Sequence, residues 1–378
     1  MGKPSKAERL KILGNLQKEI NKSYGKDVLL TAKQAKDSGV FDRNITPTPS
    51  IELNNALYCG GLSGIVELFG PPASGKTSLA IETIAKAQKE DPDFMAIWLE
   101  TEDSVTTDLL EQHGVDLSRI SFVEQHKFGN AEEALDVFIA GIRNNIFDIG
   151  VVNSVAGLLP KQEEESDLEK QNVARTAQLM SKLFRKITGY AADSKCNLIF
   201  INQLREKVGV MYGDNTTTTG GRALGFYAHQ RIRMNSLTVK KEDPISPEEG
   251  IKVSCIVYKN RFANMNNPNT KCTYYANFKT GIDSIVAIPG VLAERGIFSQ
   301  GGAWWYYPNK DNIQTLAGVE CKFNSRASLL DALRNNKPFL DEVMKLIDIS
   351  YVDAEEKDII DKDEASINQL VSSSEGGE

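Results

Sequence analysis

Apolar runs of strand length alternate with amphipathic stretches of helix length through the middle of this chain. The strand-like runs lie at residues 65–69, 94–99, 149–152 and 197–201, and the helix-like stretches lie at residues 78–88, 105–113, 131–144 and 173–191. Such alternation is typical of a parallel sheet whose strands are joined by crossover helices. After Phe226 the pattern changes to strands alone, at residues 231–237, 251–259 and 273–278. We expect these strands to extend the sheet in an antiparallel manner.

An amphipathic helix is predicted near the start of the chain. Leu13, Leu16, Ile20 and Tyr24 fall on one face, and Gly25 is a stop signal. Because this helix precedes any core, its apolar face needs a partner. The partner could be its own domain or a neighbouring subunit.

The remaining composition shifts predict further parts of the chain. The aromatic run at residues 304–307 is interpreted as the core of a small domain rather than as a platform for stacked bases. A helix is predicted around residues 325–333. The predicted parts are an N-terminal helix and linker (1–45), a core (46–284), a small α+β C-terminal domain (285–351) and a disordered acidic tail (352–378).

The residues that follow the first predicted strand read GPPASGKT, from Gly70 to Thr77. This is the G-x-x-x-x-G-K-[ST] phosphate-binding loop in its expected place between a strand and a helix. Backbone N–H groups would face phosphate oxygens, Lys76 would reach the β- and γ-phosphates, and the Thr77 hydroxyl would bind Mg²⁺. The alternative is a Gly-rich turn that fits by chance. The predicted nucleotide-binding residues of the loop are Gly70, Pro71, Pro72, Ala73, Ser74, Gly75, Lys76, Thr77 and Ser78.

Polar residues follow three of the predicted parallel strands, at the edge where such sheets bind ligands. Glu100 and Glu102 follow one strand, Asn153 another and Gln203 a third. The carboxylates could polarise an attacking water, and the Gln203 amide could sense the γ-phosphate. Asn153 stands where an Asp usually orients Mg²⁺ and its waters. Together with the phosphate loop, these residues predict an ATPase site.

A long polar segment follows Gln203, from residue 204 to residue 221. It is too rich in glycine to form a regular element, and a loop of this kind is usually functional or mobile. Its cations, small apolar side chains, hydroxyls and backbone amides suit a sugar-phosphate chain. The alternative is a solvated loop. The candidate DNA-binding residues here are Arg205, Lys207, Val208, Gly209, Val210, Met211, Gly220 and Gly221.

Charge is unevenly distributed along the 378 residues. The formal net charge is −7, and the segment 353–378 alone has nine acids and two bases, so the rest of the chain is neutral. A local basic groove is therefore allowed, and the acidic segment could compete with a polyanion for it. Without an apolar run of 18 residues or a secretory signal, we expect an intracellular protein with no membrane segment.

Cysteine and histidine give no sign of a metal site. The five cysteines are scattered and never spaced C-x-x-C, so we expect reduced, mostly buried thiols. His113, His126 and His229 have no ligand spacing between them. We interpret them as surface residues or as residues with internal hydrogen bonds.

From about Leu13 to Tyr307 the chain resembles the RecA family of homologous recombinases, most closely its bacterial and bacteriophage members. The matching motifs are GPPASGKT at 70–77, VVNSVAGLLPK at 151–161, FINQLREKVGVMYG at 200–213, TTTGGRALGFYA at 217–228 and KNR at 259–261. The resemblance implies an α/β fold, a RecA-type P-loop ATPase core with a mostly parallel twisted sheet flanked by helices. It implies ATP- and Mg²⁺-dependent assembly of a homo-oligomeric helical filament on single-stranded DNA, then homologous pairing with duplex DNA and strand exchange. Single-strand binding and loader proteins are further candidate partners, in the cytoplasm of a bacterium or of a phage's host.

The resemblance also implies roles for single residues. Glu102 would activate water and Gln203 would link the nucleotide state to DNA. Lys259 and Arg261 resemble the cations that one subunit donates to the phosphates bound by its neighbour, which would make hydrolysis depend on assembly. The implied DNA-binding loops span about 162–175, with Val173 and Arg175, and about 205–219.

Three residues depart from the family pattern. Asn153 stands in place of Asp, Leu109 in place of a Tyr beside the adenine, and Gly225 in place of a Lys at the subunit interface. Asn153 keeps an oxygen acceptor for a Mg²⁺-bound water but lacks the charge. It motivates one alternative function, a filament-forming single-strand DNA-binding scaffold with little ATP turnover. A second alternative is a ring-forming helicase with the same core.

Overall fold

The computed structural model describes residues 4–25, 27–39, 42–164, 173–206, 216–241, 243–262 and 270–347. The chain forms two compact units, Met1–Asn44 and Ile45–Glu378. The predicted acidic tail and most of both predicted DNA-binding loops lie outside the described residues.

The first unit contains two helices, α1 (Lys6–Tyr24) and α2 (Ala32–Asp37). Ser5 and Glu8 form a capping box at the start of α1, and Gly25 ends the helix in the left-handed conformation. The predicted helix and its stop are confirmed. No residue of α1 is buried, and Leu16 and Tyr24 of its apolar face are exposed. Among the described residues of this unit, the apolar face of α1 is therefore only partly covered, at Leu13 and Ile20.

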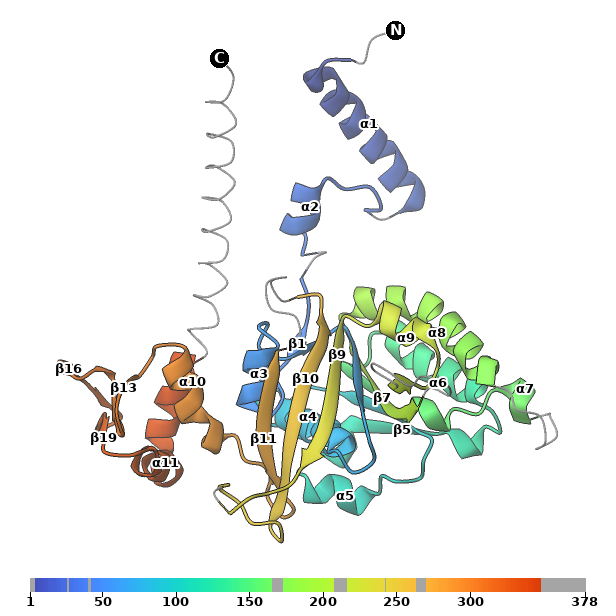
Figure 1. Ribbon diagram of the computed structural model, residues 1–378. Helices are drawn as coiled ribbons and strands as arrows, with labels where there is room; N and C mark the ends of the chain where they lie inside the picture. The colour runs from blue at the N-terminus through green and yellow to red at the C-terminus, as the bar shows by residue number, and fades with distance from the viewer. Residues whose placement is uncertain are drawn as a thin grey trace, which may run out of the picture. The chain divides into compact units, whose positions relative to one another are not determined.

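One large sheet organises the second unit (Figure 1). Its strands, in spatial order, are β12 (Gly281–Ile282), β11 (Lys271–Asn277), β10 (Gly250–Asn260), β9 (Gln230–Leu237), β3 (Ile65–Gly70), β7 (Asn197–Glu206), β6 (Ile149–Asn153), β4 (Ala96–Glu100) and β5 (Ile120–Glu124). Neighbouring strands pair parallel from β9 to β5 and antiparallel from β9 to β12. The predicted mostly parallel sheet is confirmed.

Two details of the sheet differ from the sequence-based expectation. β9 does not belong wholly to the antiparallel extension, because the chain crosses back through α9 (Arg222–Tyr227) and enters β9 parallel to β3. The edge strand β5 was not predicted. Its residues Ser121 and Phe122 are both exposed, so its apolar pattern is too short to be recognised. Smaller strands are β8 (Thr216–Thr218), which pairs with β7, and the pair β1 (Ile45–Thr46) and β2 (Leu62–Ser63).

Helices cover both faces of the sheet (Figure 1). Besides α9 they are α3 (Ile51–Ala56), α4 (Lys76–Glu90), α5 (Thr107–Gln112), α6 (Ala131–Arg143), α7 (Lys161–Glu164) and α8 (Val173–Ser194), with 3-10 turns η1 (Leu117–Arg119), η2 (Gln125–Lys127) and η3 (Val155–Gly157). Val66 and Leu68 of β3 pack with α4, whereas Ile65 packs with Phe138 of α6 and Phe184 of α8. Successive strand residues point to opposite faces, so one core lies on each side of the sheet.

A third core lies in the C-terminal part of the unit. Its elements are η4 (Ile285–Ala287), α10 (Ile288–Glu294), β13 (Ser299–Gly301), β14 (Trp304–Tyr306), β15 (Pro308–Asn309), β16 (Asn312–Ile313), β17 (Thr315–Leu316), β18 (Val319–Glu320), β19 (Lys322–Phe323) and α11 (Arg326–Asn335). Trp305 is buried here with Phe323 and Phe339, as the core interpretation of the aromatic run predicts. Trp304 contradicts that interpretation, because it is 41% exposed on the other side of β14. It stacks on Tyr306 instead.

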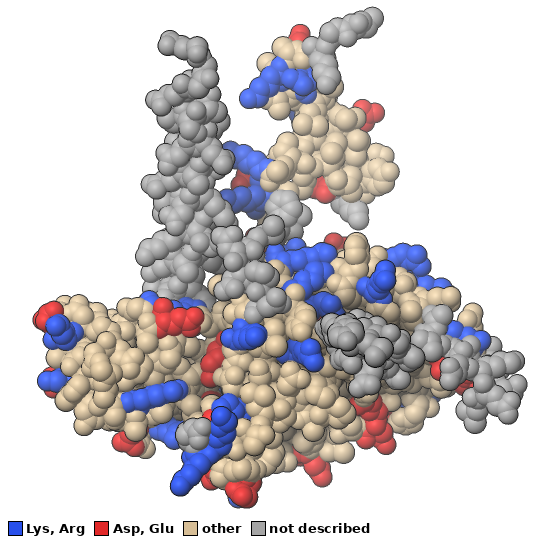
Figure 2. All heavy atoms as spheres, in the orientation of Figure 1, with Lys and Arg blue, Asp and Glu red and all other residues tan. Residues whose placement is uncertain are grey.

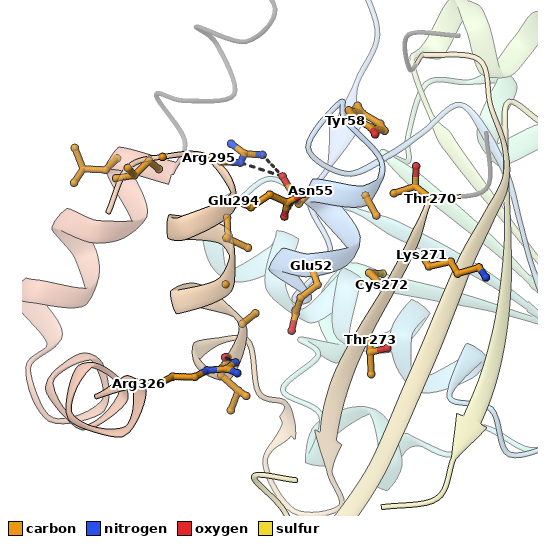
Figure 3. A pocket seen from close by; sticks show the side chains of 18 of the residues that line it. Glu52, Asn55, Tyr58, Thr270, Lys271, Cys272, Thr273, Glu294, Arg295 and Arg326 are labelled. Atoms are coloured by element: carbon orange, nitrogen blue, oxygen red, sulfur yellow. Dashed lines mark hydrogen bonds between the residues drawn. The ribbon is translucent and has the colours of Figure 1, made fainter. Parts of the chain in front are cut away.

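A pocket of about 940 Å³ lies between these C-terminal elements and the core (Figure 3). It lies between α3, β11 and α10. Glu52 extends from α3 into it, and burial raises the pKa of the Glu52 carboxyl to about 7. Asn55 ties the two sides together, since its side chain bonds both Glu294 and Arg295.

Cysteine and histidine behave as predicted. The cysteines are all reduced, with Cys196, Cys255 and Cys321 buried. His113 lies 3.2 Å from Glu82, His126 is exposed, and His229 accepts a hydrogen bond from the Ile65 amide.

Candidate functional site

Two glycines shape the predicted phosphate loop, which joins β3 to α4. A Cβ atom on Gly70 would lie 2.0 Å from the Met234 carbonyl oxygen, so any larger residue would displace the neighbouring strand. Gly75 has φ +82°, in the left-handed region that L side chains rarely adopt. The loop conformation therefore depends on glycine at both of these positions.

The N-terminus of α4 has no side-chain cap. Its N-cap is Gly75, whereas Ser, Thr or Asn side chains cap α1, α3, α5 and α6. The first-turn N–H groups of a helix have no intrahelical acceptor, and the helix dipole favours an anion there. The loop and first turn, Gly70 to Ser78, are therefore a candidate anion site.

Lys76 points back over this loop. Its Nζ donates to the carbonyl oxygens of Gly70 (3.2 Å) and Pro71 (2.7 Å) and to Ser74 Oγ (3.2 Å). Burial lowers the pKa of Lys76, and the carboxylate of Glu102 opposes that effect. All three of its acceptors are uncharged, so a phosphate oxygen would be a stronger partner for the ammonium group.

The carboxyl ends of four parallel strands meet beside the loop. Gly70 of β3 is opposite Gln203 of β7, and Asn153 of β6 is opposite Ile201 of β7 and Glu100 of β4. The three polar strand ends predicted from the sequence therefore lie at one edge of the sheet.

Glu102 and Gln203 are hydrogen-bonded to each other. Gln203 Nε2 donates to Glu102 Oε1 over 2.9 Å, and Ser154 Oγ donates to the same oxygen. Glu102 is exposed, so water can reach its carboxylate. Its effect on the pKa of Lys76 shows that the two charges are near each other. The predicted base, the predicted sensor and the loop lysine are thus brought together.

Asn153 is fully buried beside this group. Its Nδ2 donates to both carboxylate oxygens of Glu100, at 2.9 and 3.2 Å, and to Ser104 Oγ at 3.1 Å. Its Oδ1 is buried and has no hydrogen-bond partner. A buried acceptor of this kind is costly unless a ligand or a water satisfies it.

The oxygen chemistry at this edge fits Mg²⁺ with a nucleotide. Mg²⁺ keeps several waters and takes few protein ligands alongside substrate phosphates. Thr77 lies in the first turn of α4 and supplies a hydroxyl, and the free Asn153 Oδ1 supplies an acceptor for a metal-bound water. The described residues contain no cluster of three His, Cys, Asp or Glu side chains, so they offer no competing all-protein metal cage.

Lys259 in β10 and Arg261 just after it lie on the side of β3 that faces away from β7, β6 and β4. Lys259 is opposite Arg231 in the register of β10 and β9, and Arg231 is opposite Glu67, three residues before Gly70. Strands rise about 3.3 Å per residue, so Lys259 lies about 10 Å from the level of Gly70 along the strands, and Arg261 lies further still.

Both cations bind carbonyl groups at the end of α9. Lys259 Nζ donates to the carbonyl oxygens of Gly225 and Phe226, both at 3.0 Å, and Arg261 Nη2 donates to Phe226 O, also at 3.0 Å. Burial, together with the charges of Arg261 and Arg231, lowers the pKa of Lys259 to about 8. An anion bound beside Lys259 would raise the pKa of its ammonium group again.

The structure describes only part of the predicted DNA-binding set. Gly220 and Gly221 pack closely, since a Cβ atom would lie 3.0 Å from Val155 at Gly220 and 2.8 Å from Ala177 at Gly221. Arg175 in α8 has a buried Nη1 without a hydrogen-bond partner. Val173 begins α8 and Arg205 lies in β7, but their side chains are outside the described residues, as are Lys207, Val208, Gly209, Val210 and Met211 entirely.

A buried ion pair behind the loop escaped sequence reasoning. Glu67 of β3 is fully buried and pairs with Arg231 of β9. Its other oxygen accepts from Asn202 Nδ2, which also donates to the Thr219 carbonyl (3.0 and 2.9 Å). A glutamate inside the apolar run 65–69 is the signal that could have revealed this link.

Known proteins resemble this chain over most of its length. The family model described as the RecA N-terminal domain matches residues 11–283. The chain belongs to the RecA family. The RecA protein of Bacteroides thetaiotaomicron is 38% identical over 306 residues, covering 80% of this chain and 88% of that protein. The RecA protein of Clostridium acetobutylicum is 33% identical over 353 residues, covering 89% and 97%. The similarity to RecA proteins therefore extends beyond the residues that the family model matches.

Leu109 and the surface charges are two further features of this RecA family member. Leu109, which the resemblance places beside the adenine, packs against the core on the α4 side of the sheet. In Figure 2, Lys and Arg gather along the upper part of the core and again at its lower left, whereas Asp and Glu are scattered along the lower part and at the left end. Across the part of the chain that is described, no helix is both long and apolar enough to span a membrane.

Proposed function

We propose that this protein is a DNA-dependent ATPase that forms helical filaments on single-stranded DNA and catalyses homologous pairing and strand exchange. Membership of the RecA family supports the recombinase function. The observation that carries the mechanism is the hydrogen bond between Glu102 and Gln203. It joins the proposed base to the strand that leads into the second proposed DNA-binding loop.

The chain's own residues supply binding, orientation and a base. Bound ATP with Mg²⁺ supplies the phosphoryl group and the charge neutralisation for its transfer to water. The α4 N-terminus and Lys76 would bind the phosphates, with Thr77 and Asn153 toward the metal and its water. Glu102 would take a proton from the attacking water once Gln203 turns its amide away from Glu102 Oε1.

A movement of Gln203 would be transmitted through β7 to the proposed DNA-binding loop. β7 ends at Glu206 and β8 begins at Thr216, and these strands pair at Leu204 with Thr218. Asn202, next to Gln203, holds the Thr219 carbonyl at the return. Both ends of the proposed DNA-binding loop are therefore attached to residues beside the sensor, so a change of partner at Gln203 would shift the loop.

We further propose that Lys259 and Arg261 act on the nucleotide of a neighbouring subunit. Lys259 and Arg261 are separated from their own phosphate loop because β10 is two strands away from β3 and Lys259 lies level with Glu67 rather than with Gly70. The lowered pKa of Lys259 means that a neighbour's phosphates would strengthen its charge. Hydrolysis would then require assembly.

The test compares Glu102→Gln with Asp103→Asn, which changes the adjacent exposed carboxylate as a matched control. We expect DNA-stimulated ATP hydrolysis in the wild type and the control, and its loss in Glu102→Gln with ATP and DNA binding retained. Normal hydrolysis in Glu102→Gln would refute the base assignment. Electron microscopy with single-stranded DNA separates filaments from rings, so rings with duplex unwinding would favour the helicase alternative. Filaments without turnover in the wild type would favour the scaffold.

The remaining partners and the location rest on the resemblance. We propose that single-strand binding and loader proteins assist assembly on DNA. We place the reaction in the cytoplasm, of a bacterium or of the host of a phage that encodes the protein. Pull-down of such proteins on single-stranded DNA with ATP is the direct test.

A further inference from the structure

Glu100 and Asn153 form a buried pair at the centre of the site. They end the neighbouring strands β4 and β6 and face each other in register. Glu100 is 5% exposed and Asn153 is not exposed at all. Both oxygens of Glu100 lie within 3.2 Å of Asn153 Nδ2.

Among the described residues, the other hydrogen-bond partners of the Glu100 carboxylate are also donors. Trp98 Nε1 donates to Oε2 over 2.8 Å, and the Glu102 amide donates to Oε1 over 3.0 Å. Ser104 contributes its amide at 3.4 Å and its hydroxyl at 3.3 Å. A carboxylate accepts from all of these groups at once, whereas a neutral amide at this position would face donors with its own N–H groups. The surroundings of Glu100 therefore match a group that only accepts hydrogen bonds.

This arrangement fixes the orientation of the Asn153 amide. Its Nδ2 has acceptors on Glu100 and Ser104, so a flipped amide would place Oδ1 against carboxylate oxygens. Oδ1 must then point away from Glu100, and it is the buried atom without a partner. Because Glu100 binds the Nδ2 group of the Asn153 amide, Oδ1 is the atom that remains without a partner.

We propose that Glu100 is a positioning residue for the metal site, and that it supplies through Asn153 the negative charge that an aspartate at position 153 would carry. Glu100 holds the amide so that Oδ1 accepts a hydrogen bond from a Mg²⁺-bound water. Its charge polarises the amide toward the metal. This inference rests on the proposed nucleotide site, where Glu100 acts through Asn153 rather than on the metal directly.

A charge-exchange cycle tests the pair in nucleotide-free protein. The variants are Glu100→Gln, Asn153→Asp and the double variant, with Glu124→Gln as the matched control. Glu124 ends β5 opposite Glu100, but it is bound to Lys127 at the surface. Urea unfolding should show Asn153→Asp to be less stable than wild type, because two carboxylates would then face each other. The double variant should be more stable than Asn153→Asp, because it restores one charge and one amide.

The metal role is tested by titrating Mg²⁺ against binding of a fluorescent, non-hydrolysable ATP analogue. Glu100→Gln should raise the half-saturating Mg²⁺ concentration roughly tenfold, as loss of outer-shell partners commonly does. The double variant should return most of the way to wild type, and Glu124→Gln should match wild type. A merely structural glutamate would leave this concentration unchanged in Glu100→Gln and would give no rescue, and either result would overturn the proposal.

Failure of the pair is distinguishable from failure of the proposed function. If the wild type itself bound no Mg²⁺-nucleotide, the proposed function would fall, while the unfolding comparison would still report on the pair. If Glu100→Gln did not fold, the difference in unfolding stability between Asn153→Asp and the double variant would still test whether residues 100 and 153 interact as proposed. A double variant no more stable than Asn153→Asp would contradict the proposal.

Discussion

Replacing Glu52 with Gln tests the energetic consequence of the pocket between the core and the C-terminal elements. Glu52 lies in the first turn of α3, where its carboxylate accepts a hydrogen bond from Ser50 Oγ at 3.1 Å. Burial is the main reason that its pKa rises from 4.5 to about 7. Asp283 adds to the rise, and Ser50 and Arg326 oppose it. Gln keeps the size and the acceptor oxygen but cannot ionise.

The magnitude follows from proton linkage. A carboxyl whose pKa is raised on folding stabilises the folded state fully below its unfolded pKa, and this contribution is lost as pH rises through the folded pKa. With pKa values of 4.5 unfolded and about 7 folded, the free energy of unfolding should fall by about 2.5 kcal/mol between about pH 5 and about pH 8 on account of this group.

Urea unfolding at a series of pH values measures this slope. Glu52→Gln should remove most of the decline and be the more stable protein above neutral pH. Glu294→Gln, which changes an exposed carboxylate of the same pocket, is the matched control and should keep the wild-type slope. Parallel pH profiles for wild type and Glu52→Gln would refute the reasoning, because they would show that Glu52 ionises as easily in the folded protein as in the unfolded chain.

Three further predictions follow from the loop and its cations. Lys76→Ala should abolish ATP hydrolysis, since it removes the ammonium that lies over Gly70 and Pro71, and unchanged turnover would exclude that role. The kcat/KM for DNA-stimulated ATP hydrolysis should decline as pH rises through about 8, where Lys259 loses its charge. Lys259→Arg should move this decline to higher pH. A decline at the same pH in Lys259→Arg would show that another group causes it. Gly70→Ala should cost roughly 3 kcal/mol or more in urea unfolding because of the Met234 carbonyl, whereas Gly189→Ala in α8, with nothing within 4 Å, should be neutral or stabilising.

Much of the fold follows from local patterns. β3, β4, β6 and β7 are buried on both faces and so appear as continuous apolar runs, which mark them and their crossover helices. β5 lacks that signal because it is an exposed edge. The direction of β9 depends on how the chain returns from β7 to β3, and no periodicity within residues 230–237 records that return.

Only part of the candidate site could likewise be predicted from local sequence. GPPASGKT is contiguous, so its residues and their order could be read directly. The contacts that give the site its chemistry join residues far apart in the chain, as Glu102 with Gln203 and Glu100 with Asn153 do. Strand register brings them together, and register is a property of the whole sheet. The distance of Lys259 from its own phosphate loop is likewise visible only once β10 is paired with β9.

The position of Lys259 and Arg261 gives the proposed filament a direction. If each subunit completes the site of the next, a row of subunits has one fewer complete site than it has members. Turnover per subunit then rises with length in short rows and levels off in long ones. The terminal subunit whose nucleotide meets no neighbour keeps its ATP after the interior subunits have hydrolysed theirs. One end thus remains in the ATP-bound state for longest, and the two ends of the row differ chemically although every subunit is the same.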